Sequence, residues 1–296
     1  MFDVIIIGKG PAGLSAAIYT VRAGLRTMVI GQDKSVLLKA DRIENYFGFA
    51  EPVSGKYLLE QGEKQAVKLG VKFDNNEVVA LEKGEYFEVY TTGENYSGKA
   101  VLLATGQQIA KVKIEGINKF EGNGVSYCTT CDGFFYRGLK VGLLGYRDFA
   151  IHEAMELEPL TENITIFTNG RQLELTEKYR NIAQRFKINT NTIKAIDGKD
   201  AIEHIIFEDG SKEELDGLFV AYESASSIDF ARKLGVITLK NAIVVDEKQE
   251  TNLKGLYAAG DCTGGLKQIS TAVGQGALAA RQIIEYVRGL NFLWKE

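Results

Sequence analysis

The sequence predicts an α/β protein made of two doubly wound, Rossmann-like dinucleotide-binding modules, the second inserted into the first. A buried strand at residues 4–7 runs into the glycine turn Gly8-x-Gly10-x-x-Gly13 and then into an apolar helix. The same layout returns at residues 141–157, around Gly145. Repeated strand, turn and helix units of this kind are typical of parallel-sheet modules.

The remaining segments predict where the two modules begin and end. Residues 78–101 contain strand-like runs separated by glycines, which favours a β-meander within the first module. A strand at 243–245 and a helix from about residue 271 to residue 287 return to the first module. We therefore expect one domain from residues 1–113 and 238–296, and a second from residues 114–237. A chain of 296 residues is long enough for both cores.

Composition narrows the class of protein. Hydrophobic residues make up 45% and charged residues 25% of the chain, an ordinary globular balance. The net charge of −4 argues against a nucleic-acid binder that relies on positive charge. No apolar run reaches the roughly 18 residues that span a bilayer, and no basic leader precedes the first strand. We expect a cytoplasmic protein without nucleic-acid or membrane partners.

The first glycine turn predicts a nucleotide site. Gly8 permits the tight turn, Gly10 lets a pyrophosphate approach the backbone, and Gly13 allows the helix to pack closely on the strand. The next strand ends Ile30-Gly31-Gln32, without the acidic residue that binds the ribose of NAD. The site is therefore atypical for NAD.

The cysteines predict redox chemistry. Cys128 and Cys131 form a C-x-x-C, a spacing that closes a small disulfide ring, and helical placement lowers the pKa of the leading thiol. The alternative is half of a zinc site, but no second cysteine pair is present and both histidines, His152 and His204, lie far away in the sequence. We expect Cys262 to be a buried structural residue and His152 to be packed or solvated.

The segment Cys128-Thr129-Thr130-Cys131-Asp132 resembles the active site of bacterial thioredoxin reductase, and the resemblance covers nearly the whole chain. It implies FAD as cofactor, thioredoxin as partner and a homodimer. The implied FAD-binding residues are Gly8, Gly10, Pro11, Ala12, Gly13, Asn45, Ala104, Thr105, Gly106, Gly260, Asp261, Gln268 and Ile269.

The resemblance also implies individual roles. Asp261 hydrogen-bonds the ribityl or phosphate region of the flavin, although a turn or helix cap is the alternative. The helix that starts near Gln268 faces the flavin ring, where its N-terminus stabilises negative charge. Cys131 faces the flavin, Cys128 attacks the substrate disulfide, and Asp132 acts as acid and base.

Three departures from the family pattern concern the second module. Arg147 occupies the middle-glycine position of the turn Gly145-x-Arg147-x-x-Ala150. The strand end at 167–171 lacks the basic cluster that recognises a 2′-phosphate, and residues 222–226 lack the glycine and proline of the family. We infer that the protein does not take hydride from NADPH.

Without an NADPH site, the sequence resembles the ferredoxin-dependent flavin thioredoxin reductases, which implies ferredoxin as electron donor. Two alternatives stay open at this point: a dioxygen-dependent dithiol oxidase and a non-catalytic flavin-binding regulator.

Two surface features have more than one interpretation. Basic residues at 178–187 form a candidate ferredoxin-docking patch or a solvated helix face; they are Lys178, Arg180, Arg185 and Lys187. Phe292 and Trp294 in the tail either cap a hydrophobic seam or dimer contact, or cover the flavin.

Overall fold

The computed structural model describes residues 1–106 and 112–289, which form two compact units. The first unit comprises Met1–Gln108 and Ser226–Glu296, and the second comprises Ile109–Ala225. Each unit is described by itself below. The tail residues Phe292 and Trp294 lie outside the described residues.

The expected domain boundary at residue 238 differs from the division in the structure. Helix α6 (Ser227–Lys233) belongs to the first unit. The hydroxyls of Ser227 and Thr105 are 2.8 Å apart, and the Ser227 N–H donates to Thr105 Oγ1 at 3.0 Å. These bonds tie the start of α6 to the chain that leaves the central strand of the first unit, a pairing over 122 residues of sequence.

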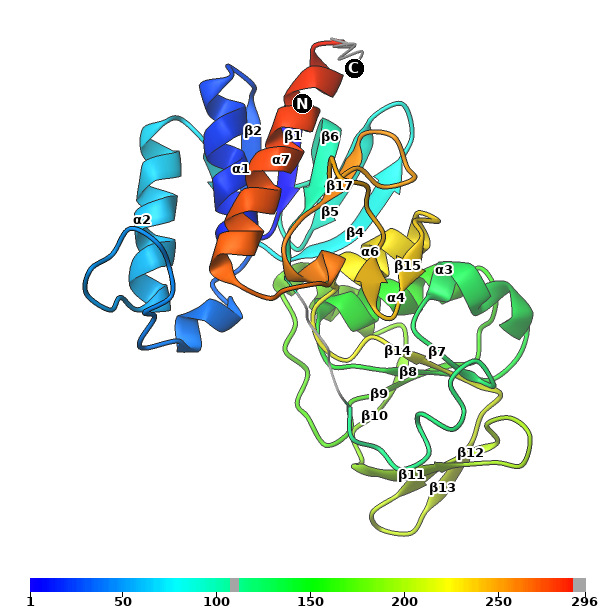
Figure 1. The fold of residues 1–296 in the computed structure, drawn as a ribbon. Helices are drawn as coiled ribbons and strands as arrows, with labels where there is room; N and C mark the ends of the chain where they lie inside the picture. The colour runs from blue at the N-terminus through cyan, green and yellow to red at the C-terminus, as the bar shows by residue number, and fades with distance from the viewer. Residues whose placement is uncertain (107–111, 290–296) are drawn as a thin grey trace. The chain divides into compact units, whose positions relative to one another are not determined.

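The first unit has a mixed sheet in which the described strands follow the order β3-β2-β1-β6-β5-β4, with β17 also paired to β6 (Figure 1). The neighbours from β3 to β6, and β17, are parallel, whereas β4, β5 and β6 form the expected antiparallel meander. The strands are β1 (Phe2–Ile7), β2 (Thr27–Ile30), β3 (Lys72–Asp74), β4 (Val78–Lys83), β5 (Phe87–Thr91), β6 (Tyr96–Leu103) and β17 (Leu256–Ala258).

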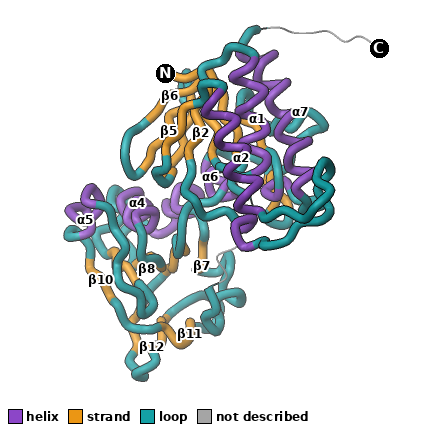
Figure 2. Tube along the Cα trace, turned by 90° about the vertical axis from the view of Figure 1, so that its left-hand side faces the viewer, coloured by secondary structure: helices purple, strands orange, loops and turns teal. Residues whose placement is uncertain are grey.

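Helices α1 (Pro11–Arg22) and α7 (Ile269–Val287) pack along each other beside this sheet, and α2 (Gly55–Lys68) lies next to α1 (Figure 2). Small residues make the close contact possible: Ala16, Ala17, Ala279 and Ala280 are fully buried in one core. A two-stranded ribbon of β15 (Thr238–Leu239) and β16 (Ala242–Ile243) completes the unit. The strand expected at 243–245 is thus shorter, and Val244 is exposed.

The second unit has a parallel sheet in the order β10-β9-β8-β14-β7 and a small antiparallel sheet in the order β11-β12-β13. Its helices are α3 (Thr129–Asp132), α4 (Asp148–Leu157) and α5 (Glu177–Ala183). Its strands are β7 (Val125–Ser126), β8 (Val141–Leu144), β9 (Ile164–Phe167), β10 (Lys187–Asn189), β11 (Ile193–Asp197), β12 (His204–Phe207), β13 (Lys212–Glu214) and β14 (Gly217–Val220).

Within the described residues, no helix is both long and apolar enough to span a membrane. The parallel sheets with flanking helices agree with the α/β fold class expected from the repeated glycine turns.

The contact between α1 and α7 yields a stability prediction. A Cβ at Gly276 would lie 2.2 Å from the Ala12 carbonyl oxygen, so Gly276→Ala must push the helices apart. We expect it to lower the free energy of unfolding by at least about 2 kcal/mol in denaturant titrations followed by circular dichroism. Gly274→Ala is the control on the same helix, because nothing lies within 4 Å of its added Cβ. Equal stability of the two variants would contradict this packing.

Candidate active site

The first glycine turn is built by close backbone contacts. Gly8 has φ +122°, and a Cβ there would lie 2.3 Å from the Ala104 carbonyl oxygen. A Cβ at Gly13 would lie 2.0 Å from the Gly8 carbonyl oxygen. A Cβ at Gly10 would meet only the Ala104 oxygen, at 4.0 Å. The outer glycines therefore hold the turn together, whereas Gly10 leaves one side of it open.

The helix that follows begins at this open side. Gly10 is the N-cap of α1 and no side chain caps the helix; Pro11 stands in the first turn, which has no acidic residue. Backbone N–H groups at such a helix start bind phosphate, because they are donors at the positive end of the helix dipole. The turn and the helix start can therefore receive the pyrophosphate of a dinucleotide.

Residues far apart in the sequence meet at the start of α7. The Asn45 amide donates to Gln268 Oε1 at 2.9 Å, across 223 residues. Gln268 is the extended N-cap of α7, which also has no side-chain cap. Just before it, Gly260 has φ +84° and its N–H donates to Gln275 Oε1 at 2.8 Å. The half-buried Asp261 follows in a short 3-10 helix.

A buried lysine inside the first glycine turn was missed by the sequence analysis. The Lys9 ammonium lies 2.6 Å from Asp33, 3.7 Å from Glu63 and 2.8 Å from the Asn75 side-chain oxygen. The Lys9 side chain is only 6% exposed. A Cβ at Gly31 would lie 3.3 Å from the Lys9 backbone nitrogen, so glycine relieves a tight contact with the turn.

These contacts change the interpretation of the second strand. No acidic residue stands at the end of β2 itself, but Asp33 follows it and is paired with Lys9. Lys9 thereby connects the chain after β2 with α2 and with the chain after β3. The sequence offered one sign of this ion pair: Lys9 is a charged residue between two glycines of the turn.

The corresponding turn of the second unit is filled by the protein itself. Arg147, at the middle-glycine position, pairs with Glu174 at 2.8 Å, and the Glu174 N–H donates to the Tyr146 carbonyl at 2.9 Å. The buried Tyr146 ring packs edge-on against Tyr222, with centroids 5.2 Å apart. The guanidinium of Arg171 hydrogen-bonds Tyr222.

The start of α4 also differs from the start of α1. Asp148 occupies its first turn, is 4% exposed and accepts the Thr176 N–H at 2.9 Å. Burial raises the pKa of this carboxyl. A phosphate here would displace protein contacts and face Asp148, so the second turn does not offer the open helix start that the first turn has.

Cys128 and Cys131 form a disulfide at the start of α3. Cys128 is 5% exposed, and its sulfur accepts the Cys131 N–H at 3.2 Å. Cys131 is exposed. The roles implied by the resemblance stay predictions: Cys131 is expected to face the flavin and Cys128 to attack the substrate disulfide.

Asp132 is held by the strand before the disulfide. Ser126 Oγ donates a hydrogen bond to Asp132 Oδ2 at 2.6 Å. Ser126 Oγ also accepts a hydrogen bond from the Cys128 N–H at 3.1 Å. Ser126 was not predicted as part of the site; it connects the carboxylate with the turn that carries the first cysteine. Asp132 is half-buried and can exchange protons with solvent.

Two exposed phenylalanines follow the disulfide directly. Phe134 is 65% and Phe135 is 74% exposed, and the Arg137 guanidinium lies 5.3 Å from the Phe134 ring. Adjacent exposed aromatic rings with a nearby arginine are typical of protein-binding surfaces.

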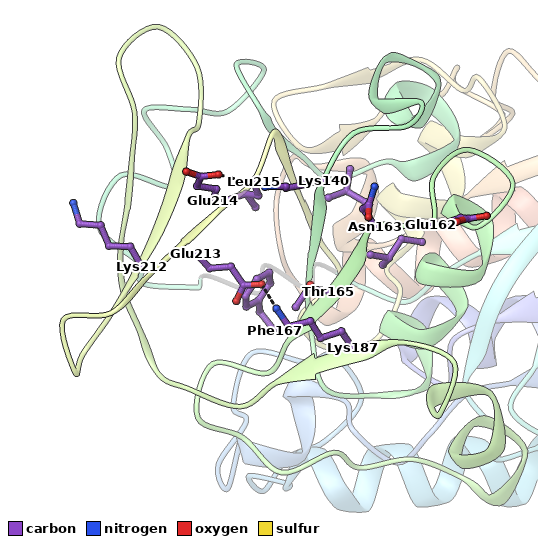
Figure 3. A pocket seen from close by; sticks show the side chains of 12 residues that line it. Lys140, Glu162, Asn163, Thr165, Phe167, Lys187, Lys212, Glu213, Glu214 and Leu215 are labelled. Atoms are coloured by element: carbon purple, nitrogen blue, oxygen red, sulfur yellow. Dashed lines mark hydrogen bonds and ion pairs between the residues drawn. The ribbon is translucent and has the colours of Figure 1, made fainter.

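A cavity of about 620 Å³ lies elsewhere in the second unit, near the first residues of β8, β9 and β10 (Figure 3). Lys187 pairs with Glu213 at 2.6 Å and Lys140 with Glu214 at 3.3 Å, so its walls neutralise much of their own charge. Nucleotides bind at the carboxyl ends of parallel strands, which is the opposite edge of this sheet. The cavity is not the nucleotide site.

The two α/β units, one with an open dinucleotide turn and the other with a C-x-x-C disulfide, define a flavoprotein disulfide oxidoreductase. Residues 2–276 match the family described as pyridine nucleotide-disulphide oxidoreductase. The chain belongs to this family.

Related proteins cover nearly the whole chain. The thioredoxin reductase of Treponema pallidum (strain Nichols) is 36% identical over 98% of this chain and 98% of its own length. The atypical thioredoxin reductase TRi of Desulfovibrio vulgaris Hildenborough has a similar structure, with a TM-score of 0.94, 40% identity, and coverage of 99% and 100% of the two chains.

A ferredoxin-flavin thioredoxin reductase of Clostridium acetobutylicum is similar with a TM-score of 0.70 and 32% identity, over 97% of this chain and 98% of that one. The thioredoxin reductases of this family use FAD, and the prediction of FAD as cofactor is confirmed at this level.

The Lys9 contacts predict an effect on cofactor binding. Lys9→Met removes the cation that holds three segments around the first glycine turn, and we expect the dissociation constant for FAD to rise about tenfold. Fluorescence titration of the apoprotein with FAD measures it. Lys34→Met is the control, since Lys34 is exposed and makes no ion pair with the described residues. Equal affinities of both variants would contradict the role of Lys9.

Proposed function

We propose that this protein is a flavin-dependent disulfide reductase that passes electrons from ferredoxin through FAD and the Cys128–Cys131 pair to thioredoxin. The observation that carries the proposal is the contrast between the two glycine turns. The first is open at Gly10, whereas the second is filled by Arg147 and its partners.

FAD is assigned to the first unit. The N–H groups at the start of α1 hold the pyrophosphate, with Gly8 and Gly13 shaping the turn and Ala104, Thr105 and Gly106 lining it. Asp261 binds the ribityl or phosphate region, and Asn45, Gln268 and Ile269 lie at the flavin ring, where the start of α7 stabilises negative charge. The Asn45–Gln268 hydrogen bond supports this grouping. When bound, the flavin accepts single electrons and passes pairs to a disulfide.

Three contacts argue against NADPH as the donor. Arg147 and Glu174 occupy the side of the second turn where a pyrophosphate approaches the backbone. Asp148 places a carboxylate at the helix start that would hold the phosphates. Tyr146 and Tyr222 pack against each other at the end of the parallel strands. Each would have to move before a dinucleotide could bind.

Ferredoxin is the donor that fits a flavin without a nicotinamide partner, and the similarity to the ferredoxin-flavin enzyme of C. acetobutylicum supports it. The basic patch at 178–187 gives weaker support. Arg185 pairs with Glu158, and Lys187 with Glu213, so these two charges are compensated. Those two residues fit the solvated-surface alternative better than a docking role.

The order of thiol exchange follows the roles implied by the resemblance. Once reduced, the Cys128 thiolate attacks the thioredoxin disulfide and forms a mixed disulfide, releasing one thioredoxin thiolate. Cys131, the flavin-facing thiol, then attacks the Cys128 sulfur, which re-forms the internal disulfide and releases reduced thioredoxin. The Cys131 N–H stabilises the Cys128 thiolate, and Asp132 exchanges the protons.

Thioredoxin fits the exposed segment that follows the cysteine pair. Phe134 and Phe135 offer exposed apolar rings, and the Arg137 guanidinium lies over the Phe134 ring. A partner that covers these rings brings its own disulfide to the cysteine pair.

The filled second turn predicts the electron donor. Under anaerobic conditions, we expect reduced ferredoxin to bleach the flavin absorbance quickly, and NADPH and NADH to leave it unchanged. A thioredoxin reductase with an intact second glycine turn is the control for the nucleotides. Fast stoichiometric bleaching by either nucleotide would overturn the donor assignment. Peroxide production with a dithiol in air, without reduction by ferredoxin, would identify a dithiol oxidase instead.

Single cysteine variants test the order of exchange. We expect Cys131→Ser to accumulate a mixed disulfide with thioredoxin, because its Cys128 can attack but no second thiol resolves the adduct. Cys128→Ser should form little of it and should abolish thioredoxin reduction, since the remaining Cys131 faces the flavin. Non-reducing electrophoresis with a thioredoxin that lacks its own resolving cysteine measures both. The opposite pattern would make Cys131 the attacking thiol.

A further inference from the structure

Two glutamates of α4 contact the turn between the cysteines. Thr129 Oγ1 lies 2.6 Å from Glu153 Oε2 and 2.8 Å from Glu156 Oε2. Thr130 Oγ1 lies 3.0 Å from the same Glu156 oxygen. Thr129 is 3% and Glu153 is 2% exposed, so the contact between them forms away from bulk water.

The Thr129 hydroxyl has fewer hydrogens than the two carboxylate oxygens that contact it require. A threonine hydroxyl has one hydrogen and can donate it to one carboxylate at a time. A second ionised carboxylate oxygen within 2.8 Å of the hydroxyl oxygen would face only lone pairs. Such a contact becomes favourable when the second carboxyl is protonated and donates to Thr129.

We propose that Glu153 and Glu156 share one proton at neutral pH and act, through Thr129, as positioning residues for the Cys128–Cys131 pair. The inference rests on the proposed role of this pair as the redox disulfide. The glutamates do not need to contact the sulfurs, because they are hydrogen-bonded to Thr129 and Thr130, the two residues between the cysteines.

The surroundings connect the pair with solvent. His152 Nε2 lies 3.4 Å from Glu156 Oε1, and the Tyr179 hydroxyl lies 3.3 Å from His152 Nδ1. Glu156 is 29% and His152 is 18% exposed at their side chains. Lys178 lies over the Tyr179 ring at 5.5 Å, and Asp132 is bound to Ser126. These charged and titratable groups belong to α3, α4 and α5.

The shared proton matters when the disulfide is reduced. Reduction takes up two electrons and two protons, and loss of either thiol proton leaves a thiolate on the turn. With one proton held between the glutamates, that thiolate lies near one carboxylate charge instead of two. Ionisation of the pair at higher pH therefore disfavours the thiolate, because like charges raise each other's pKa.

Infrared difference spectroscopy of the oxidised holoprotein tests for the shared proton. We expect wild type at neutral pH to show a protonated carboxyl band that is lost in both Glu153→Gln and Glu156→Gln, since the remaining carboxylate then ionises. Asp148 and Asp229, whose pKa values are raised by burial, are unchanged in these variants and cancel in the difference. Loss of the band in only one variant, or its absence in wild type, would overturn the proposal.

The pH dependence of iodoacetamide alkylation of the reduced protein tests the coupling. We expect the wild-type rate profile of Cys131 to spread over two ionisations and that of Glu156→Gln to follow one. Glu158→Gln is the control, since Glu158 ends the same helix but pairs with Arg185. Identical profiles for wild type and Glu156→Gln would overturn the coupling. This failure leaves the thioredoxin and ferredoxin measurements unaffected, so the two proposals are separable.

Discussion

The backbone contact between Gly13 and Gly8 is the constraint on which the first unit depends. A Cβ added at position 13 would lie 2.0 Å from the Gly8 carbonyl oxygen. Any residue other than glycine at this position would therefore force α1 away from β1. The helix therefore starts directly above the strand end and points its uncapped N–H groups into the open turn. The position of α1 in turn fixes α7, whose Gly276 contacts the Ala12 carbonyl. One steric requirement thus aligns both helix starts proposed to hold the flavin.

In the second unit, the glycine that packing requires is present, whereas the position that a ligand would approach carries an arginine. A Cβ at Gly145 would lie 2.2 Å from the Ala221 oxygen and 2.6 Å from the Ala150 Cβ, so glycine is still required where strand and helix meet. The middle position does not carry such a requirement, because nothing but a ligand needs the space beside it. Arg147 fills it and pairs with Glu174. Packing preserves the fold while the ligand contacts disappear.

Sequence patterns predicted the elements governed by local rules. The glycine turns, the meander of β4 to β6 and the helix now found as α7 follow from spacing and periodicity, although α7 begins at Ile269 instead of about residue 271. Contacts between distant residues were not accessible in this way. The attachment of α6 through Thr105 and Ser227 is one such contact, and the Lys9–Asp33 pair is another.

Glu153 shows why part of the site could not be predicted. It falls on the apolar face of α4 with Phe149, Ala150 and Leu157, and a buried carboxyl at such a position is costly unless it is hydrogen-bonded. One partner is Thr129, which lies 24 residues earlier and outside any periodic pattern. The sequence shows the unusual position, but only the fold supplies the group that compensates for it.

The charges around the cysteine turn explain how a redox pair can work there. Ser126, Glu153 and Glu156 are hydrogen-bonded neighbours of the turn, and two of them are carboxylates that oppose a thiolate there. The Cys131 N–H supplies one donor to the Cys128 sulfur. The remaining cost is electrostatic, and it is smallest when the glutamates retain a proton. A proton retained by the two glutamates therefore removes one negative charge that would otherwise oppose reduction.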